Sequence, residues 1–172
     1  MNIRPATQDD LPQILEIHND AIRRLDAIWT ETEETLADRK AWLNERNANG
    51  FAVLVAEQDG MILGHASYGT YRSKPGYRKT VEHSVYLRED AQGKGAGKAL
   101  MGALIDDARA KGFHLMVAVI DARNENSIAL HQRLGFSLAG RLPQAGFKHG
   151  RWLDQVNMVL LLNDDPAPPR GY

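Results

Sequence analysis

A glycine-rich segment between two apolar segments constrains this sequence more than any other feature. The segment reads Gln92-Gly93-Lys94-Gly95-Ala96-Gly97 and is followed by Lys98. Residues 80–87 (TVEHSVYL) are rich in β-branched and aromatic side chains, and residues 96–111 carry apolar side chains at helical spacing. Glycines allow tight turns, and the free N–H groups of a helix N-terminus attract anions. With two lysines beside it, this strand–loop–helix unit predicts a pyrophosphate site.

The glycine spacing distinguishes three kinds of phosphate loop. The Walker form, with four residues before its Gly-Lys-Ser/Thr, is absent. The Rossmann form G-x-G-x-x-G does not match glycines at positions 93, 95 and 97. The third form, Q/R-x-x-G-x-G/A, fits Gln92, Gly95 and Gly97. A helix cap without a ligand is the alternative, and the preceding strand, the long helix and the lysines argue against it.

The remaining segments predict a mixed α/β domain, with antiparallel strands first and a βαβ unit later. The expected helices are one that begins near Thr7 and residues 35–47, 96–111 and 127–134. The expected strands are residues 2–4, 51–57, 61–68, 80–87, 115–120, 136–139 and 154–162. Asp59-Gly60 between two apolar runs is a hairpin signal. We expect one domain over residues 1–162, followed by a proline-rich, disordered tail at 163–172.

Composition excludes several classes of function. The 172 residues carry a net charge of −1, which provides no basic field for nucleic acid. No apolar run reaches the roughly 18 residues that span a bilayer, and the N-terminus lacks the apolar region of a secretory signal, so we expect a cytoplasmic location. Without cysteine, an acyl-cysteine intermediate is impossible. The six histidines lack metal-site spacing, and we expect no metal.

Several segments together resemble the GNAT superfamily of N-acetyltransferases. The Q-x-x-G-x-G loop is similar to the acetyl-CoA loop of that family, and Asn124-Glu125-Asn126-Ser127-Ile128-Ala129-Leu130-His131, followed by Leu134-Gly135-Phe136, is similar to its second signature. Three further segments resemble the branch that contains phosphinothricin and methionine sulfoximine acetyltransferases: TVEHSVY at 80–86, Ala27-Ile28-Trp29 and Gly150-Arg151-Trp152-Leu153-Asp154. The resemblance covers the chain up to the tail. It implies a GNAT fold, in which helices flank a mixed, mostly antiparallel sheet and a splayed strand pair binds acetyl-CoA.

The resemblance implies a cofactor site for acetyl-CoA. The backbone of Val85, Tyr86 and Leu87 would pair with the pantetheine arm, as an added strand does. The pyrophosphate would lie on Gly93, Lys94, Gly95, Ala96, Gly97 and Lys98. Asn124 and Ser127 would lie near the sulfur end. Core packing is the alternative for Val85 and Leu87, and both interpretations can hold together.

Glu82 is the expected general base, which would deprotonate the attacking amine. It lies three residues before Val85 on the same strand, where it could face the acetyl group, and partial burial would raise its pKa from about 4.3. A surface or ion-paired glutamate is the alternative. His131 stands where related enzymes often have the tyrosine that protonates the thiolate. It could serve as that acid or be a hydrogen-bonded packing residue.

The expected substrate-binding residues are Arg72, Ser73, Lys74, Glu82, His83 and Ser84. Arg72 could hold a carboxylate or a phosphinate oxygen with its planar fork, and the alternative for Arg72 and Lys74 is solvated loop charge. The family tends to have an aromatic residue at the position of Lys74, which leaves the substrate open. Trp29 and Trp152 could line the pocket, contact another subunit or belong to the core.

The resemblance therefore implies an N-acetyltransferase that uses acetyl-CoA. The amine of methionine sulfoximine, methionine sulfone, phosphinothricin or a related L-amino acid would attack directly in a ternary complex, and the enzyme would be a homodimer. Two alternatives remain. A protein of the same fold could acetylate a protein N-terminus or a lysine, or the domain could bind CoA without catalysis.

Overall fold

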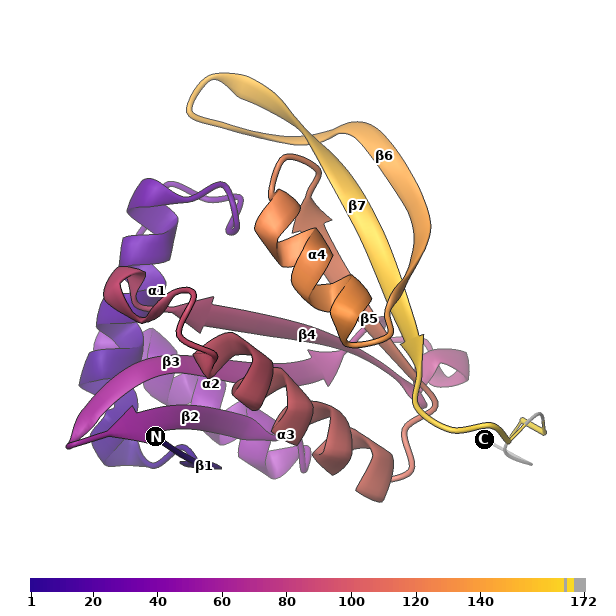
Figure 1. Ribbon diagram of the computed structural model, residues 1–172, viewed down its shortest axis with the longest axis horizontal. Coiled ribbons are helices and arrows are strands. Elements are labelled where there is room, and N and C mark those ends of the chain that lie inside the picture. Colours follow the sequence, from indigo (N-terminus) through magenta and orange to yellow (C-terminus); the bar gives the residue numbers. More distant parts are fainter. Residues whose placement is uncertain (166, 169–172) are drawn as a thin grey trace.

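One seven-stranded sheet positions the rest of the molecule. The computed structural model describes residues 1–165, 167 and 168. The strands are β1 (Asn2–Pro5), β2 (Val53–Gln58), β3 (Met61–Thr70), β4 (Thr80–Leu87), β5 (Leu115–Asp121), β6 (Ser137–Lys148) and β7 (Arg151–Leu161). They lie in the order β1-β2-β3-β4-β5-β7-β6, and β4–β5 is the parallel pair among antiparallel ones (Figure 1). This confirms the predicted mixed, mostly antiparallel sheet.

Helices cover both faces of the sheet. They are α1 (Leu11–Arg24), α2 (Leu36–Ala48), α3 (Ala96–Ala110) and α4 (Glu125–Arg133), with short 3-10 turns η1 (Gln8–Asp10), η2 (Pro75–Tyr77) and η3 (Glu89–Ala91). The apolar sides of α1 and α2 pack on one face, and α3 packs on the other, with α4 beside it (Figure 1). The predicted order of strands and helices is confirmed.

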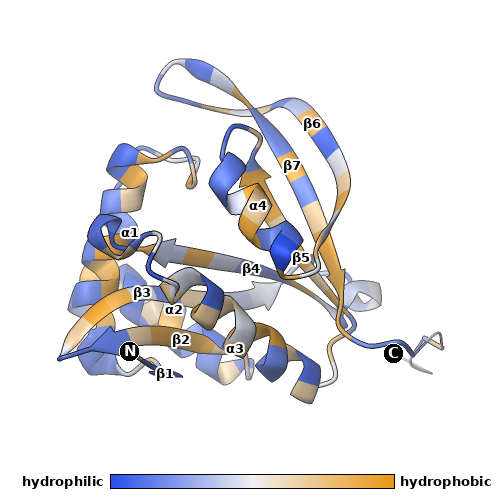
Figure 2. Cartoon of the chain, viewed as in Figure 1, coloured by the Kyte–Doolittle hydropathy of each residue, from blue (hydrophilic) through white to orange (hydrophobic). Residues whose placement is uncertain are grey.

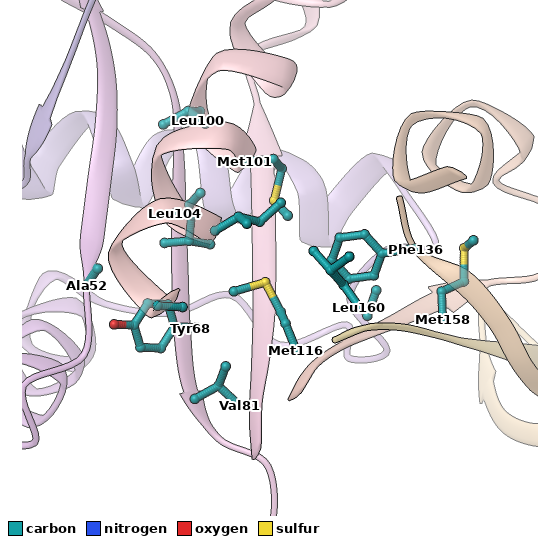
Figure 3. Packing of buried hydrophobic residues seen from close by; sticks show 14 of the residues in the cluster. Ala52, Tyr68, Val81, Leu100, Met101, Leu104, Met116, Phe136, Met158 and Leu160 are labelled. Atoms are coloured by element: carbon teal, nitrogen blue, oxygen red, sulfur yellow. The ribbon is translucent and has the colours of Figure 1, made fainter. Parts of the chain in front are cut away.

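The larger hydrophobic core lies between α3 and the sheet. The predicted apolar stripe of α3 is buried there, and it comprises Leu100, Met101, Leu104, Ile105 and Ala108. Figure 3 shows Leu104 close to Tyr68 and Met116, with Leu100 and Met101 further along the helix and Phe136, Met158 and Leu160 extending the cluster towards β7. Figure 2 shows the matching hydrophobic stretches on β2, β3 and β5. This core therefore joins the two halves of the sheet.

The parallel strands β4 and β5 separate soon after they begin. They pair at three positions, Thr80 with Leu115, Val81 with Met116 and Glu82 with Val117. β4 continues to pair with β3 as far as Leu87, and β5 continues with β7 as far as Asp121. Beyond Glu82 the facing edges of β4 and β5 therefore have no strand partner among the residues that the structure describes. This wedge is the splayed strand pair that the resemblance implies.

The last two strands are longer than the sequence analysis expects. The predictions of 136–139 and 154–162 are too short, because β6 and β7 form a long hairpin whose turn contains His149 and Gly150 with φ of 49° and 70°. The ladder is interrupted by register shifts, and most of β6 is exposed. Figure 2 shows alternating colours along this hairpin rather than one continuous hydrophobic strand.

The start of α4 and the segment after β7 also differ from the prediction. α4 begins two residues before the expected Ser127, because the Asn124 side chain accepts a hydrogen bond from the Ser127 N–H (3.0 Å) and caps the helix at residue 124. After β7, the Asn163 side chain donates to the Phe113 carbonyl (3.0 Å) and bonds His114 Nδ1 (2.9 Å). Much of the expected tail lies outside the described residues, and its disorder stays a prediction.

Candidate active site in the wedge between β4 and β5

A cleft of about 360 Å³ occupies the wedge. Its walls come from β4, β5, the start of α4 and the connection between α1 and α2. It is lined by Ala27, Ile28, Trp29, Glu82, His83, Ser84, Val85, Tyr86, Ala118, Val119, Ile120, Asp121, Asn124, Ser127 and His131. Eight of the residues predicted for the site therefore lie in one cleft: Glu82, His83, Ser84, Val85, Tyr86, Asn124, Ser127 and His131.

The glycine loop has the geometry of an anion site. Gly93 and Gly95 have φ of 72° and 88°, in the left-handed region that favours glycine. Within the described chain, no acceptor takes the N–H groups of residues 93–98, and no side chain caps α3 at Gly95. A Cβ at Gly97 would lie 3.3 Å from a Leu87 methyl carbon, so glycine keeps the loop close to β4. These residues fit a pyrophosphate.

The exposed backbone edge of β4 coexists with core packing of its side chains. Val85 and Leu87 pack against the core beneath α3. Tyr86 points to the opposite face, where its ring lies 5.4 Å from those of His18 and His65, and burial raises its pKa to about 12. Because side chains hold the strand in place, its free N–H and C=O groups form a fixed edge that an extended ligand can use.

Glu82 lies where the wedge begins, and it is partly buried. Burial raises the pKa of its carboxyl group, while the positive charge of Arg46 acts in the opposite direction. Arg46 lies against Gly69, the β3 residue opposite Glu82, where a Cβ would be 2.4 Å from Arg46 Nη1. No ion pair holds Glu82 in the described residues. Alternation along β4 puts Glu82 and Val85 on opposite faces, so a ligand on the β4 edge would have to meet Glu82 through the gap between the strands.

His131 pairs with His83, a contact that the sequence analysis missed. Their Nε2 atoms lie 3.1 Å apart, and the rings stack at an interplanar angle of 18°. His131 Nδ1 lies 2.7 Å from the Ser127 carbonyl oxygen, which can only accept, so Nδ1 carries the proton. Burial lowers the pKa of both imidazoles, that of His83 to about 3. In the neutral pair, His83 Nε2–H therefore donates to His131 Nε2.

The three loop residues expected to bind substrate lie outside the cleft. Arg72, Ser73 and Lys74 are exposed in the β3–β4 connection. The Arg72 guanidinium lies over the rings of Tyr71 and Tyr77, at 5.2 and 5.8 Å from their centroids. Ser84, by contrast, lines the cleft, and its hydroxyl lies 3.3 Å from that of Ser67. A substrate role for Arg72, Ser73 and Lys74 stays a prediction.

The described residues contain neither a membrane-spanning helix nor an obvious metal site. None of their helices combines the length and the apolar character that crossing a membrane requires. No group of three His, Asp or Glu side chains in it is arranged to hold a metal ion. The cytoplasmic location stays a prediction of the sequence.

Comparison with known proteins identifies the family. Residues 11–136 match the family model described as the Acetyltransferase (GNAT) family. The chain is 51% identical to an L-methionine sulfoximine/L-methionine sulfone acetyltransferase of Pseudomonas paraeruginosa, covering 98% of each chain, and 39% identical to a phosphinothricin N-acetyltransferase of Alcaligenes faecalis, covering 94% of this chain and 82% of that one. The structure of yncA from Salmonella typhimurium with its cofactor acetyl-CoA superposes with a TM-score of 0.97 at 45% identity over 99% of each chain. The fold and the site thus define an acetyl-transferring enzyme. The chain belongs to the GNAT acetyltransferase family.

Proposed function

We propose that this enzyme transfers the acetyl group of acetyl-CoA to the α-amine of a small L-amino acid such as methionine sulfone, methionine sulfoximine or phosphinothricin. The observation that carries the proposal is the position of Glu82, a partly buried carboxylate beside the free edge of β4 and in the same cleft. The names of the two relatives support this substrate class.

The residues that would hold acetyl-CoA form a path from the loop to the cleft. The N–H groups of residues 93–98, with Lys94 and Lys98, would bind the pyrophosphate, and the free edge at 85–87 would bind the pantetheine arm. Asn124 and Ser127 line the facing wall. Bound there, acetyl-CoA supplies the acetyl group as a thioester. Backbone N–H groups near Leu87 would stabilise negative charge that develops on the carbonyl oxygen.

Glu82 would act as the general base. An amino-acid amine is protonated at neutral pH and must lose a proton before it attacks. In direct attack, the new C–N bond forms as the C–S bond breaks, and Glu82 takes the proton of the amine, directly or through one water. Because the active form of Glu82 is the carboxylate and burial raises its pKa, kcat/KM should rise with pH through a value above the usual one for glutamate.

A role for His131 as the acid that protonates the thiolate has weaker support than the role of Glu82. The Nδ1 proton of His131 is held by the Ser127 carbonyl, and its Nε2 accepts from His83. His131 would therefore need a second proton to act as an acid, and burial lowers its pKa and opposes that state. His83 and Ser84 would contribute to the walls of the substrate site, and Arg72, Ser73 and Lys74 would contribute charge and hydrogen bonds from the loop.

The proposal is tested by steady-state kinetics of CoA release. Methionine sulfone, phosphinothricin, unmodified amino acids and short peptides serve as acceptors. Glu82→Gln should lower kcat/KM for the best amino acid by roughly 10²–10⁴-fold, while calorimetry gives an unchanged Kd for acetyl-CoA. Glu16→Gln, which changes an exposed glutamate of α1, is the control. Turnover of peptides but not amino acids, or an active Glu82→Gln variant, would contradict the proposal.

We also propose that the enzyme is a homodimer. In support, Phe147 and Trp152 of the β6–β7 hairpin are 70% and 64% exposed and stack edge to face with ring centroids 5.9 Å apart. Neighbouring exposed aromatic side chains are typical of protein interfaces. Light scattering should give twice the chain mass for the wild type and a lower mass for Trp152→Glu. A wild-type monomer at micromolar concentration would contradict the proposal.

A further inference from the structure

The connection between α1 and α2 forms one wall of the cleft. Its residues Ala27, Ile28 and Trp29 line the cleft, as do polar groups of β4. Figure 1 shows this connection reaching from the end of α1 towards α4 and the β6–β7 hairpin. It is an apolar wall, so its position decides how much space remains for the side chain of an acceptor.

Hydrogen bonds and ion pairs hold this wall at both ends. The Lys148 ammonium donates to the carbonyls of Ile22 and Leu25, at 2.6 and 2.5 Å. The Asp26 carboxylate pairs with Arg123 and Arg151 at 2.6 and 3.1 Å. At the far end, the Asn19 side chain donates to the Glu34 carbonyl and accepts from its N–H, both at 2.9 Å. The backbone around Trp29 therefore has little freedom to move away.

The Trp29 indole itself lies between this backbone and β6. Its Nε1 donates to the Asp26 carbonyl at 2.8 Å, which fixes one edge of the ring. The ring lies directly against Gly146, where a Cβ would be 2.3 Å from Cε3 and 2.7 Å from Cζ3. Gly146 does not line the cleft, whereas Trp29 does. A side chain at position 146 would therefore force the indole, which lines the cleft, out of its present position.

We propose that Gly146 and Trp29 together set the length of acceptor side chain that the cleft admits. Gly146 is a specificity-determining residue that acts through Trp29 and contacts neither acetyl-CoA nor the acceptor amino acid. The inference rests on the proposed function, because it needs an amino acid in this cleft. It assigns Trp29 to the acceptor rather than to acetyl-CoA, whose binding groups lie on β4, α3 and α4.

The test compares two acceptors that differ by one methylene group, L-methionine sulfone and S-methyl-L-cysteine sulfone. Gly146→Ala should lower the ratio of kcat/KM for the longer acceptor to that for the shorter one by about tenfold, the effect of a methylene group in a tight pocket. The KM for acetyl-CoA should stay unchanged. Gly140→Ala in the same strand is the matched control, because a Cβ there meets no atom within 4 Å, and it should keep the wild-type ratio.

A second variant keeps the test decisive if Gly146→Ala does not fold. Trp29→Leu enlarges the cleft from the same wall and should move the ratio in the opposite direction. An unchanged ratio in both variants would overturn the inference while leaving the proposed function intact. A raised KM for acetyl-CoA with an unchanged ratio would place Trp29 at the cofactor and would also overturn it. If the wild type acetylates neither probe, the proposed function fails, and the inference fails with it.

Discussion

Replacing Lys148 by methionine should destabilise the protein strongly, although the residue lies outside the cleft. Lys148 ends β6 and is only 1% exposed. Its ammonium bonds two carbonyls at the C-terminal end of α1, Ile22 O and Leu25 O. The last carbonyls of a helix have no partner within the helix, and the helix dipole favours a cation there.

The magnitude follows from those two bonds. Hydrogen bonds from a charged group contribute about 1.5–3 kcal/mol each. Methionine keeps most of the apolar stem and avoids the cost of burying an ammonium. We therefore take the lower end of the range for the two bonds together, which is a loss of about 3 kcal/mol in the free energy of unfolding. For a protein of this size, each kcal/mol changes Tm by about 2–4 °C. Lys148→Met should therefore melt about 6–12 °C below the wild type.

Differential scanning calorimetry and urea unfolding measure this effect. The control is Lys40→Met, which removes a charge from an exposed position of α2 and should change the free energy of unfolding by less than about 0.5 kcal/mol. If the two variants melt within about 2 °C of each other, the two hydrogen bonds contribute little. Lys148 would then not be what holds the α1–α2 connection in place.

Two other substitutions test the cofactor edge and an ion pair. In Gly64→Ala, the new Cβ would lie 2.7 Å from the Tyr86 carbonyl oxygen, so β4 must shift. We expect the free energy of unfolding to fall by about 1–3 kcal/mol, and calorimetry should show weaker binding of acetyl-CoA. Gly102→Ala in α3, where a Cβ meets no atom within 4 Å, should keep the affinity, and equal affinities in both variants would contradict the reasoning. In the second case, the Arg4 guanidinium bonds both oxygens of Asp10 at 2.8 Å and lowers the pKa of that carboxyl to about 2. The carboxylate therefore stabilises the fold above its usual pKa of 3.8, and this contribution is lost as the pH falls towards 2. The difference in the free energy of unfolding between the wild type and Asp10→Asn should therefore narrow over that pH range. A difference that stays constant with pH would count against the ion pair.

Local backbone requirements explain which parts of the fold could be predicted. The β2–β3 hairpin follows from Asp59-Gly60, whose φ values of 52° and 79° suit few other residue pairs. Gly93 and Gly95 mark the loop before α3 for the same reason. The turn of the β6–β7 hairpin has similar φ values at His149 and Gly150, but the extent of β6 could not be predicted. Most residues of β6 are exposed, Leu142 and Phe147 among them, so its apolar side chains do not mark one buried face.

The site could be predicted where it depends on one segment and not where it depends on packing between segments. Residues 82–86 of β4 follow each other in the chain, and they line the cleft in the wedge. The pairing of His83 with His131 joins residues 48 positions apart through the packing of α4 beside β4, which no local pattern reveals. Arg46 comes near Glu82 because Gly69 leaves room for it on the neighbouring strand.

The separation of β4 from β5 also has a mechanical consequence. Three paired positions of β4 and β5 and the core beneath α3 help to join the half-sheet β1–β4 to the half-sheet β5–β7. The two half-sheets can therefore move relative to each other about the paired ends of β4 and β5, and the size of that motion depends on what fills the wedge. A ligand that contacts the free edges of both strands would restrict it, so binding in the wedge should make the whole sheet more rigid.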